Sequence, residues 1–155
     1  MARQLLLTIA TEKTGVPATE AKGMAAITAW LLQKNLQFDE LVIENGSGLS
    51  RIERISAQHI GQLLVSAYHS ASMPEFMASL PILAQDGTVK KRLNGSQVDS
   101  RAHLKTGSID GVSAVAGYVM DSQNKRHVVV MLVNHVRAGA SQAAQDALIE
   151  WVNQQ

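Results

Sequence analysis

The chain contains no cysteine, which excludes disulfides and thiolate metal sites and is compatible with either the cytoplasm or the periplasm. Aromatic residues make up only 4% of the sequence, so the core is expected to be aliphatic. The formal net charge is only +1, with lysine and arginine scattered along the chain, which gives no electrostatic footprint for nucleic acid. No apolar run approaches membrane-spanning length. These absences leave a globular domain stabilised by packing.

The size and composition that remain favour one domain. With 155 residues, of which 46% are hydrophobic and 17% charged, the chain is long enough to bury roughly two-thirds of its unfolded surface. The opening segment Met1–Gln4 leads directly into Leu5 and lacks the length and cleavage site of a signal peptide. We therefore expect the chain to begin inside a helix.

Apolar spacing and capping signals predict helices first and strands later. The expected helices cover 2–13, a segment that begins after Thr19 and ends near Asn35, a segment after the N-cap Ser56, and a short piece within 73–83. A short strand is expected over 38–44, and three more over 102–106, 112–120 and 126–134. A final amphipathic helix capped by Ser141 is expected to carry Ala144, Leu148, Trp151 and Val152.

The fold class that these elements predict is α+β in a single domain. Residues 1–92 form its mainly helical part, and residues 93–155 form antiparallel strands with a closing helix. Residues 127–133 form a run that is continuously apolar after His127, which is typical of a strand covered on both faces and paired along both edges.

The tripeptide Lys-Thr-Gly occurs twice, in two different settings. The first copy, Lys13-Thr14-Gly15, follows an apolar helical run and precedes a proline, which is the pattern of a helix stop. The second copy, Lys105-Thr106-Gly107, ends a predicted strand and is followed by Ser108. Only this second copy is a candidate site, because it offers a cation, two hydroxyls that can bind a carboxylate, and a glycine that leaves room beside the strand. A surface strand that ends in a turn is the alternative interpretation.

Three blocks of sequence resemble the class C low-molecular-mass penicillin-binding proteins, which are D-alanyl-D-alanine carboxypeptidase/endopeptidases. They are Glu44–Arg51, Asp86-Gly87-Thr88, and His103–Ser108 with the small-residue strand through Tyr118. Their order and spacing cover nearly the whole chain. Asn45 stands where the family block usually has aspartate. The resemblance implies the penicillin-recognising serine transpeptidase/β-lactamase-like fold, action on peptidoglycan, and a periplasmic location.

The resemblance also implies roles for the second tripeptide and its neighbour. Lys105 would position and shuttle protons as a catalytic residue, while Thr106, Gly107 and Ser108 would bind the terminal carboxylate and the acyl chain of a peptidoglycan stem peptide or a β-lactam. No metal or organic cofactor is implied.

Two of the family's three active-site motifs have no convincing match here. Ser122-Gln123-Asn124-Lys125 formally satisfies both Ser-x-x-Lys and Ser-x-Asn, but one serine cannot serve both, and it falls in a polar hairpin turn. We therefore expect a C-terminal fragment that is inactive alone. Without the family's two N-terminal strands, strand 126–134 would be an exposed edge, which predicts a homodimer or swapped assembly.

Three other kinds of site lack support in the sequence. A phosphate loop at Gly46-Ser47-Gly48 lacks the third glycine, the five histidines show no metal spacing, and no Gly-x-Ser-x-Gly elbow exists for an α/β-hydrolase. A non-catalytic binding or assembly module with a degenerate site stays open, and so does the preference between carboxypeptidase and endopeptidase action.

Overall fold

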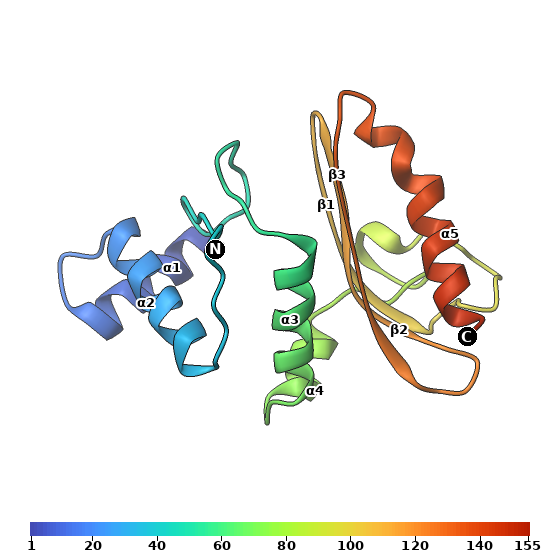
Figure 1. The fold of residues 1–155 in the computed structure, drawn as a ribbon, viewed down its shortest axis with the longest axis horizontal. Helices are drawn as coiled ribbons and strands as arrows, with labels where there is room; N and C mark the ends of the chain where they lie inside the picture. The colour runs from blue at the N-terminus through green and yellow to red at the C-terminus, as the bar shows by residue number, and fades with distance from the viewer. The chain divides into compact units, whose positions relative to one another are not determined.

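A computed structural model describes all residues from Met1 to Gln155 and divides them into two compact units, Met1–His59 and Ile60–Gln155. Their elements are shown in Figure 1. Helices α1–α4 precede residue 92, and the strands and α5 follow it, so the expected helical and strand-rich segments are where the sequence predicted. The boundary between the compact units lies earlier, near the start of α3. That all of them belong to a single domain stays a prediction.

The first unit contains two helices that pack against each other, α1 (Ala2–Thr14) and α2 (Glu20–Gln33). Gly15 ends α1 with a φ of 76° and donates its N–H to the Thr11 carbonyl at 2.8 Å. The Thr19 side chain accepts the Lys22 N–H at 3.2 Å and so caps α2. The helix stop at the first Lys-Thr-Gly and the predicted start of the second helix are therefore confirmed.

The remainder of this unit is irregular. The strand expected over 38–44 is wrong, because only a single bridge forms there, between Val42 and Arg54. One bridge leaves most backbone groups of the segment without a ladder partner, so no strand is sustained. The Asn45 side-chain oxygen accepts the Ser47 N–H at 2.8 Å and so closes a turn.

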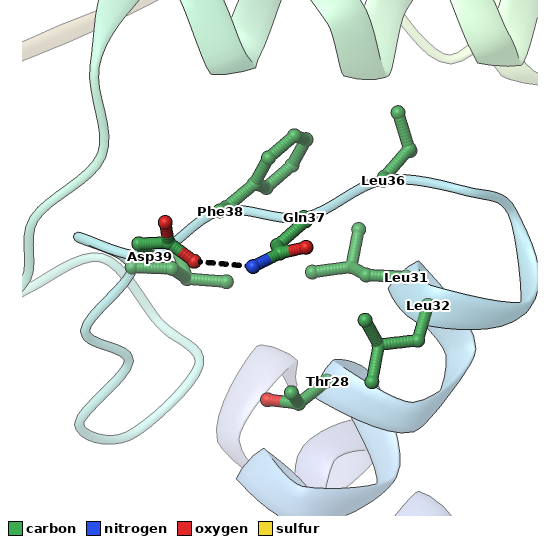
Figure 2. A pocket seen from close by; sticks show the side chains of 8 residues that line it. Thr28, Leu31, Leu32, Leu36, Gln37, Phe38 and Asp39 are labelled. Carbon is green, nitrogen blue, oxygen red and sulfur yellow. Dashed lines mark hydrogen bonds between the residues drawn. The ribbon is translucent and has the colours of Figure 1, made fainter.

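A hollow of about 420 Å³ also lies in this unit (Figure 2). Leucines from α2 and the segment after it line the hollow together with Phe38, and its polar rim includes Thr28. The Gln37 side-chain amide donates a hydrogen bond to the Asp39 carboxylate at 2.9 Å. None of the four residues predicted for the active site belongs to this lining.

Helix α3 (Ala57–Tyr68) begins at a well-organised turn. Ser56 accepts the His59 N–H with its hydroxyl at 3.2 Å, which confirms the predicted N-cap. Glu40 accepts the Ser56 N–H at 2.8 Å and lies 2.6 Å from His59 Nδ1. Hydrogen bonding, from Ser56 above all, lowers the pKa of Glu40 to about 2.

The second unit is a three-stranded antiparallel sheet with helices on both faces (Figure 1). The strands are β1 (Ala102–Ile109), β2 (Val112–Met120) and β3 (Arg126–Asn134), in the order β1-β2-β3. The predicted bounds of the last two are confirmed. β1 is three residues longer than expected, because Ile109 and Val112 pair across the two-residue loop Asp110-Gly111.

Helix α5 (Gln142–Asn153) covers one face of the sheet. Its Ile149 and Val152 join Leu104, Val115 and Val129 in a buried cluster. Two expectations for this helix are wrong. The Ser141 hydroxyl donates to the Ala138 carbonyl at 2.7 Å instead of capping α5, since η2 (Ala138–Ser141) precedes the helix. Trp151 is 59% exposed and Ala144 is exposed as well, so neither shares the buried face.

Helices α3 and α4 (Met73–Ala78) cover the other face. Tyr118 is buried among Leu64 and Met77, and its hydroxyl donates to the Leu64 carbonyl at 2.7 Å. Burial raises the pKa of Tyr118. The sheet therefore has a core on each side, which explains why β2 and β3 are so apolar.

Strand β3 does not have the two paired edges that its apolar run predicts. It pairs with β2 along its whole length and lies at the border of the sheet. The covering of both faces accounts for its apolar sequence without a second neighbour.

No helix of the chain combines the length and the apolar character that crossing a bilayer requires.

Candidate active site

The second Lys-Thr-Gly lies within β1, which forms the other border of the sheet. Lys105, Thr106, Gly107 and Ser108 face Ala116, Val115, Ala114 and Ser113 of β2, respectively. The sequence-predicted site residues are therefore consecutive on one border strand, with small residues beside them. Three of these β2 residues, Ser113, Ala114 and Ala116, have small side chains and leave space beside the side chains of β1.

The outer side of β1 is only half occupied. Leu104 donates its N–H to the Pro81 carbonyl at 2.8 Å, and Leu83 donates to the Ala102 carbonyl at 2.9 Å. Ile82 forms an isolated bridge with His103. No backbone hydrogen bond or bridge of this kind is formed by the residues of β1 after Leu104. Beyond Leu104 the outer side of the strand therefore has no backbone partner, as in an edge that can pair with an extended peptide.

The side chains of this segment are accessible. Lys105 and Ser108 are exposed, and Thr106 is half-buried. The Lys105 ammonium donates to the Thr106 carbonyl at 2.6 Å, so it has no carboxylate partner that would hold it away from a ligand. The segment thus offers a cation and two hydroxyls along one border of the sheet, with Lys105 on the opposite face of the strand from Thr106 and Ser108.

Thr88 meets this segment from a different part of the chain. Its Oγ1 lies 2.5 Å from Thr106 Oγ1. Thr88 is the middle residue of η1 (Gly87–Val89). The Asp86-Gly87-Thr88 block contributed to the family resemblance but carried no role, so sequence reasoning missed this residue. Only the resemblance block could have drawn attention to it.

The loop that holds Thr88 is fixed at several points. The Asp86 carboxylate accepts the Ile82 N–H at 2.6 Å. Gly87 has a φ of +55°, and a Cβ there would come within 2.8 Å of Pro81, so this turn requires glycine. Val89 is fully buried and its carbonyl accepts the Ala84 N–H at 3.1 Å. Thr88 is therefore held beside β1 by a rigid backbone.

Gly117 of β2 allows β1 and β2 to approach each other closely just before the Lys-Thr-Gly segment. Its φ is +151°, and a Cβ at this position would overlap the His103 carbonyl oxygen and lie 3.0 Å from the Leu104 Cα. No residue with a side chain fits there without moving β1. The position of His103 and Leu104, just before Lys105, thus depends on this glycine.

A buried ion pair fastens the segment after η1 to α5. Arg92 is 7% exposed and donates through Nε and Nη2 to the same Asp146 oxygen, at 2.8 and 2.6 Å. Both partners lie away from the solvent, so the pair restrains this stretch of chain relative to the sheet.

The formal motif Ser122–Lys125 is a turn, as predicted. The Asp121 carboxylate accepts the Gln123 and Lys125 N–H groups at 2.9 and 2.8 Å, and lies 2.7 Å from His127 Nε2. The hydrogen bond from His127 is the main cause of the lowered pKa of Asp121. Ser122 is exposed, and it lies six positions beyond the β2 partner of Lys105, roughly 20 Å along the strand direction.

The histidines do not form a metal site. No group of three or more histidine, aspartate or glutamate side chains is placed to hold an ion. His59 and His127 have carboxylate partners, and His135 accepts the Arg137 N–H at 3.1 Å. His103 Nδ1 is buried without a partner. His59, His127 and His135 are therefore hydrogen-bonded within the chain.

Comparison with known proteins gives this border strand its context. The family model described as D-Ala-D-Ala carboxypeptidase 3 (S13) matches residues 1–155. The chain belongs to this family. The D-alanyl-D-alanine carboxypeptidase of Actinomadura sp. (strain R39) is 30% identical over 153 residues, which are 95% of this chain and 28% of that protein. The D-alanyl-D-alanine carboxypeptidase DacB of Haemophilus influenzae is 26% identical over 125 residues, 79% of this chain and 26% of that protein.

Solved structures show the fold of this S13 family member. Penicillin binding protein 4 (dacB) of Haemophilus influenzae, complexed with a β-lactam, matches with a TM-score of 0.87 and 23% identity, covering 99% of this chain and 38% of that chain. The Bd0816 predatory endopeptidase of Bdellovibrio bacteriovorus matches with a TM-score of 0.68 and 16% identity, over 97% and 43%. The chain thus has part of the penicillin-binding protein fold, and it spans less than a third of the curated relatives named above.

Proposed function

We propose that this chain forms the substrate-holding wall of a serine-type D-Ala-D-Ala carboxypeptidase/endopeptidase that acts on peptidoglycan peptides in the periplasm. The observation that carries the proposal is the border position of Lys105–Ser108, with an accessible cation, two hydroxyls and a free outer backbone edge. A peptide with a free terminal carboxylate fits this combination, because its backbone can pair with the edge while its charge meets the hydroxyls and the ammonium.

Each residue of the segment has a place in the chemistry. Thr106 and Ser108 bind the terminal carboxylate, and Gly107 leaves space for the acyl chain. The Ser108 N–H is one donor to the oxyanion of the tetrahedral intermediate, a contribution worth roughly 3 kcal/mol per donor in acyl transfer. Lys105 is the catalytic residue of this chain. Its ammonium positions the attacking hydroxyl and helps to move its proton.

The reaction has two steps. A serine hydroxyl attacks the penultimate carbonyl, the peptide bond breaks, and D-alanine leaves with the proton taken from the serine. Water then attacks the acyl-serine ester, which releases the shortened peptide and restores the hydroxyl. A β-lactam acylates the same serine when its ring amide opens.

We further propose that the serine comes from a segment outside these 155 residues, so that the chain alone is inactive. Ser122 is the only serine here with lysine three residues later. It lies in an exposed turn with its hydroxyl donating to the Gln155 carbonyl at 3.2 Å, and nothing around it activates a nucleophile.

Two ligands test the proposal on the chain itself. Acetyl-D-Ala-D-Ala is titrated into ¹⁵N-labelled protein, and its L,L isomer serves as the control. We expect the D,D peptide to shift the backbone amides of residues 105–108 and the L,L peptide to leave them unchanged. Shifts confined to other regions would contradict the substrate wall. Labelled penicillin is expected to leave the chain unmodified, and covalent attachment would refute the claim that it carries no nucleophile.

The absence of an activated serine also favours a second function, a non-catalytic binding or assembly module. The genomic sequence upstream of Met1 separates the two. An in-frame extension that carries Ser-x-Asn supports the enzyme, whereas a stop codon supports the module.

The free edge of β3 supports a homodimer through residues 126–134. This strand has β2 on one side only, and its middle is a run of valines, so a second copy can extend the sheet by antiparallel pairing. Light scattering across a range of protein concentrations tests this. A monomer at the highest concentration would contradict it.

A further inference from the structure

The hydroxyl pair between Thr88 and Thr106 is the side-chain hydrogen bond that joins β1 to the preceding loop at the site. Their oxygens are 2.5 Å apart. We infer that Thr88 is a positioning residue that aims the Thr106 proton at the substrate carboxylate. This inference rests on the proposed function, because it assigns a second hydroxyl to the same ligand group.

The argument begins with the donors and acceptors of the pair. Each hydroxyl has one proton to donate and two lone pairs to accept with. At this distance one threonine donates to the other, so the pair keeps one proton for a third group. A carboxylate only accepts hydrogen bonds, so the hydroxyl that contacts it must donate. When Thr88 donates to Thr106, the free proton belongs to Thr106.

Accepting this bond also improves Thr106 as a donor. A hydroxyl that accepts a hydrogen bond becomes more polarised, and its own donated bond becomes stronger. Without Thr88, the Thr106 hydroxyl rotates among several acceptors and must be ordered when a ligand binds. That ordering and the lost polarisation both weaken the bond to the carboxylate.

The surroundings of Thr88 suit a positioning role. Its backbone is fixed by the Asp86 carboxylate, by the glycine-dependent turn at Gly87 and by the buried Val89. The Thr88 side chain itself is exposed, so its removal takes away a hydroxyl and little packing. Exposed substitutions of this kind usually change stability slightly.

The inference makes a specific statement about substrate choice. Thr88 acts through a proton that is donated to a terminal carboxylate, so it matters for peptides that end at this position. A peptide whose terminus is blocked as an amide, or which continues as a longer chain, gains much less from it. Thr88 therefore favours carboxypeptidase-type ligands at this rim.

The experiment compares Thr88→Val, which keeps the shape of the side chain, with Thr88→Ser, which keeps the hydroxyl. Dissociation constants for acetyl-D-Ala-D-Ala and for its C-terminal amide are measured from the backbone amide shifts of residues 105–108. We expect Thr88→Val to weaken binding of the carboxylate peptide about fivefold to tenfold, since a hydrogen bond to a charged group is affected. Binding of the amide should stay within about twofold, and Thr88→Ser should restore the carboxylate peptide to about the wild-type value.

A double-mutant cycle with Thr106→Val separates positioning from a structural effect. In the Thr106→Val background, Thr88→Val should cause no further loss of carboxylate binding, because the hydroxyl that it acts through is gone. If the losses of carboxylate binding caused by Thr88→Val and Thr106→Val add in full in the double variant, the inference is overturned.

The remaining outcomes distinguish this inference from the proposed function. If the wild type prefers the carboxylate peptide and Thr88→Val keeps that preference, only the role of Thr88 is refuted. If the wild type does not distinguish the carboxylate from the amide, carboxylate binding at this rim is refuted, and the role of Thr88 with it.

Discussion

Replacing Gly117 with alanine tests whether the close approach of β1 and β2 holds the site. The new Cβ would overlap the His103 carbonyl oxygen and lie 3.0 Å from the Leu104 Cα. These are backbone atoms, so no side-chain rotation relieves the overlap. The strands must separate at His103, two residues before Lys105.

The size of the effect follows from two costs. An alanine with a φ of +151° occupies a sparsely populated backbone region that costs about 1–3 kcal/mol outside glycine. Forcing the packed strands apart costs about 1–3 kcal/mol more. We therefore expect Gly117→Ala to lower the free energy of unfolding by about 4 kcal/mol, a large share of the 5–15 kcal/mol typical of a domain.

Urea unfolding followed by far-ultraviolet circular dichroism measures this change. Gly107→Ala is the matched control, because the same substitution in the neighbouring strand places its Cβ 3.6 Å from that of Ala114, an ordinary contact. It should change stability by less than about 1 kcal/mol. If Gly117→Ala costs no more than Gly107→Ala, the reasoning from the strand approach is refuted.

Three further predictions use the same unfolding assay. Arg92→Leu leaves the Asp146 carboxylate without its ion-pair partner and should cost about 3 kcal/mol; a loss below about 1 kcal/mol would contradict this. Tyr118→Phe removes the bond to the Leu64 carbonyl and should cost about 1 kcal/mol, with an unchanged stability as the contrary result. The pKa of Asp121 is lowered by folding, so its stabilisation is present above the pKa of an unfolded aspartate and is lost as the pH falls through the folded value. The difference in unfolding free energy between wild type and Asp121→Asn should therefore shrink below about pH 4, and a constant difference would exclude this linkage.

The elements that sequence reasoning predicted well are those with local signals. Thr19 and Ser56 cap their helices as expected, and the bounds of β2 and β3 agree with the predicted strands. A cap acts within three residues and apolar alternation within one strand, so the information lies in a short window. The extra length of β1 also had a local signal, the Asp110-Gly111 pair that joins it to β2.

The elements that were predicted wrongly depend mostly on distant partners. Segment 38–44 alternates weakly but finds a single bridge, at Val42. Ser141 precedes α5 but is the last residue of the short helix η2, and its hydroxyl donates to the Ala138 carbonyl of that helix. Trp151 has helical spacing with Leu148, yet Val152 faces the sheet and Trp151 does not. For segment 38–44 and for Trp151 the deciding partners lie outside the window from which the expectation was made, whereas the Ser141 hydroxyl bonds three residues back instead of forward.

For this protein, the order of residues alone determined the α+β class, the two strands after β1 and the candidate segment Lys105–Ser108, because periodicity, turn chemistry and short motifs act over a few positions. The tertiary structure decided which strands lie at the borders of the sheet and that Thr88 meets Thr106. These two threonines are 18 positions apart, and no pattern along a chain specifies such a contact until the loop between them has folded onto the sheet.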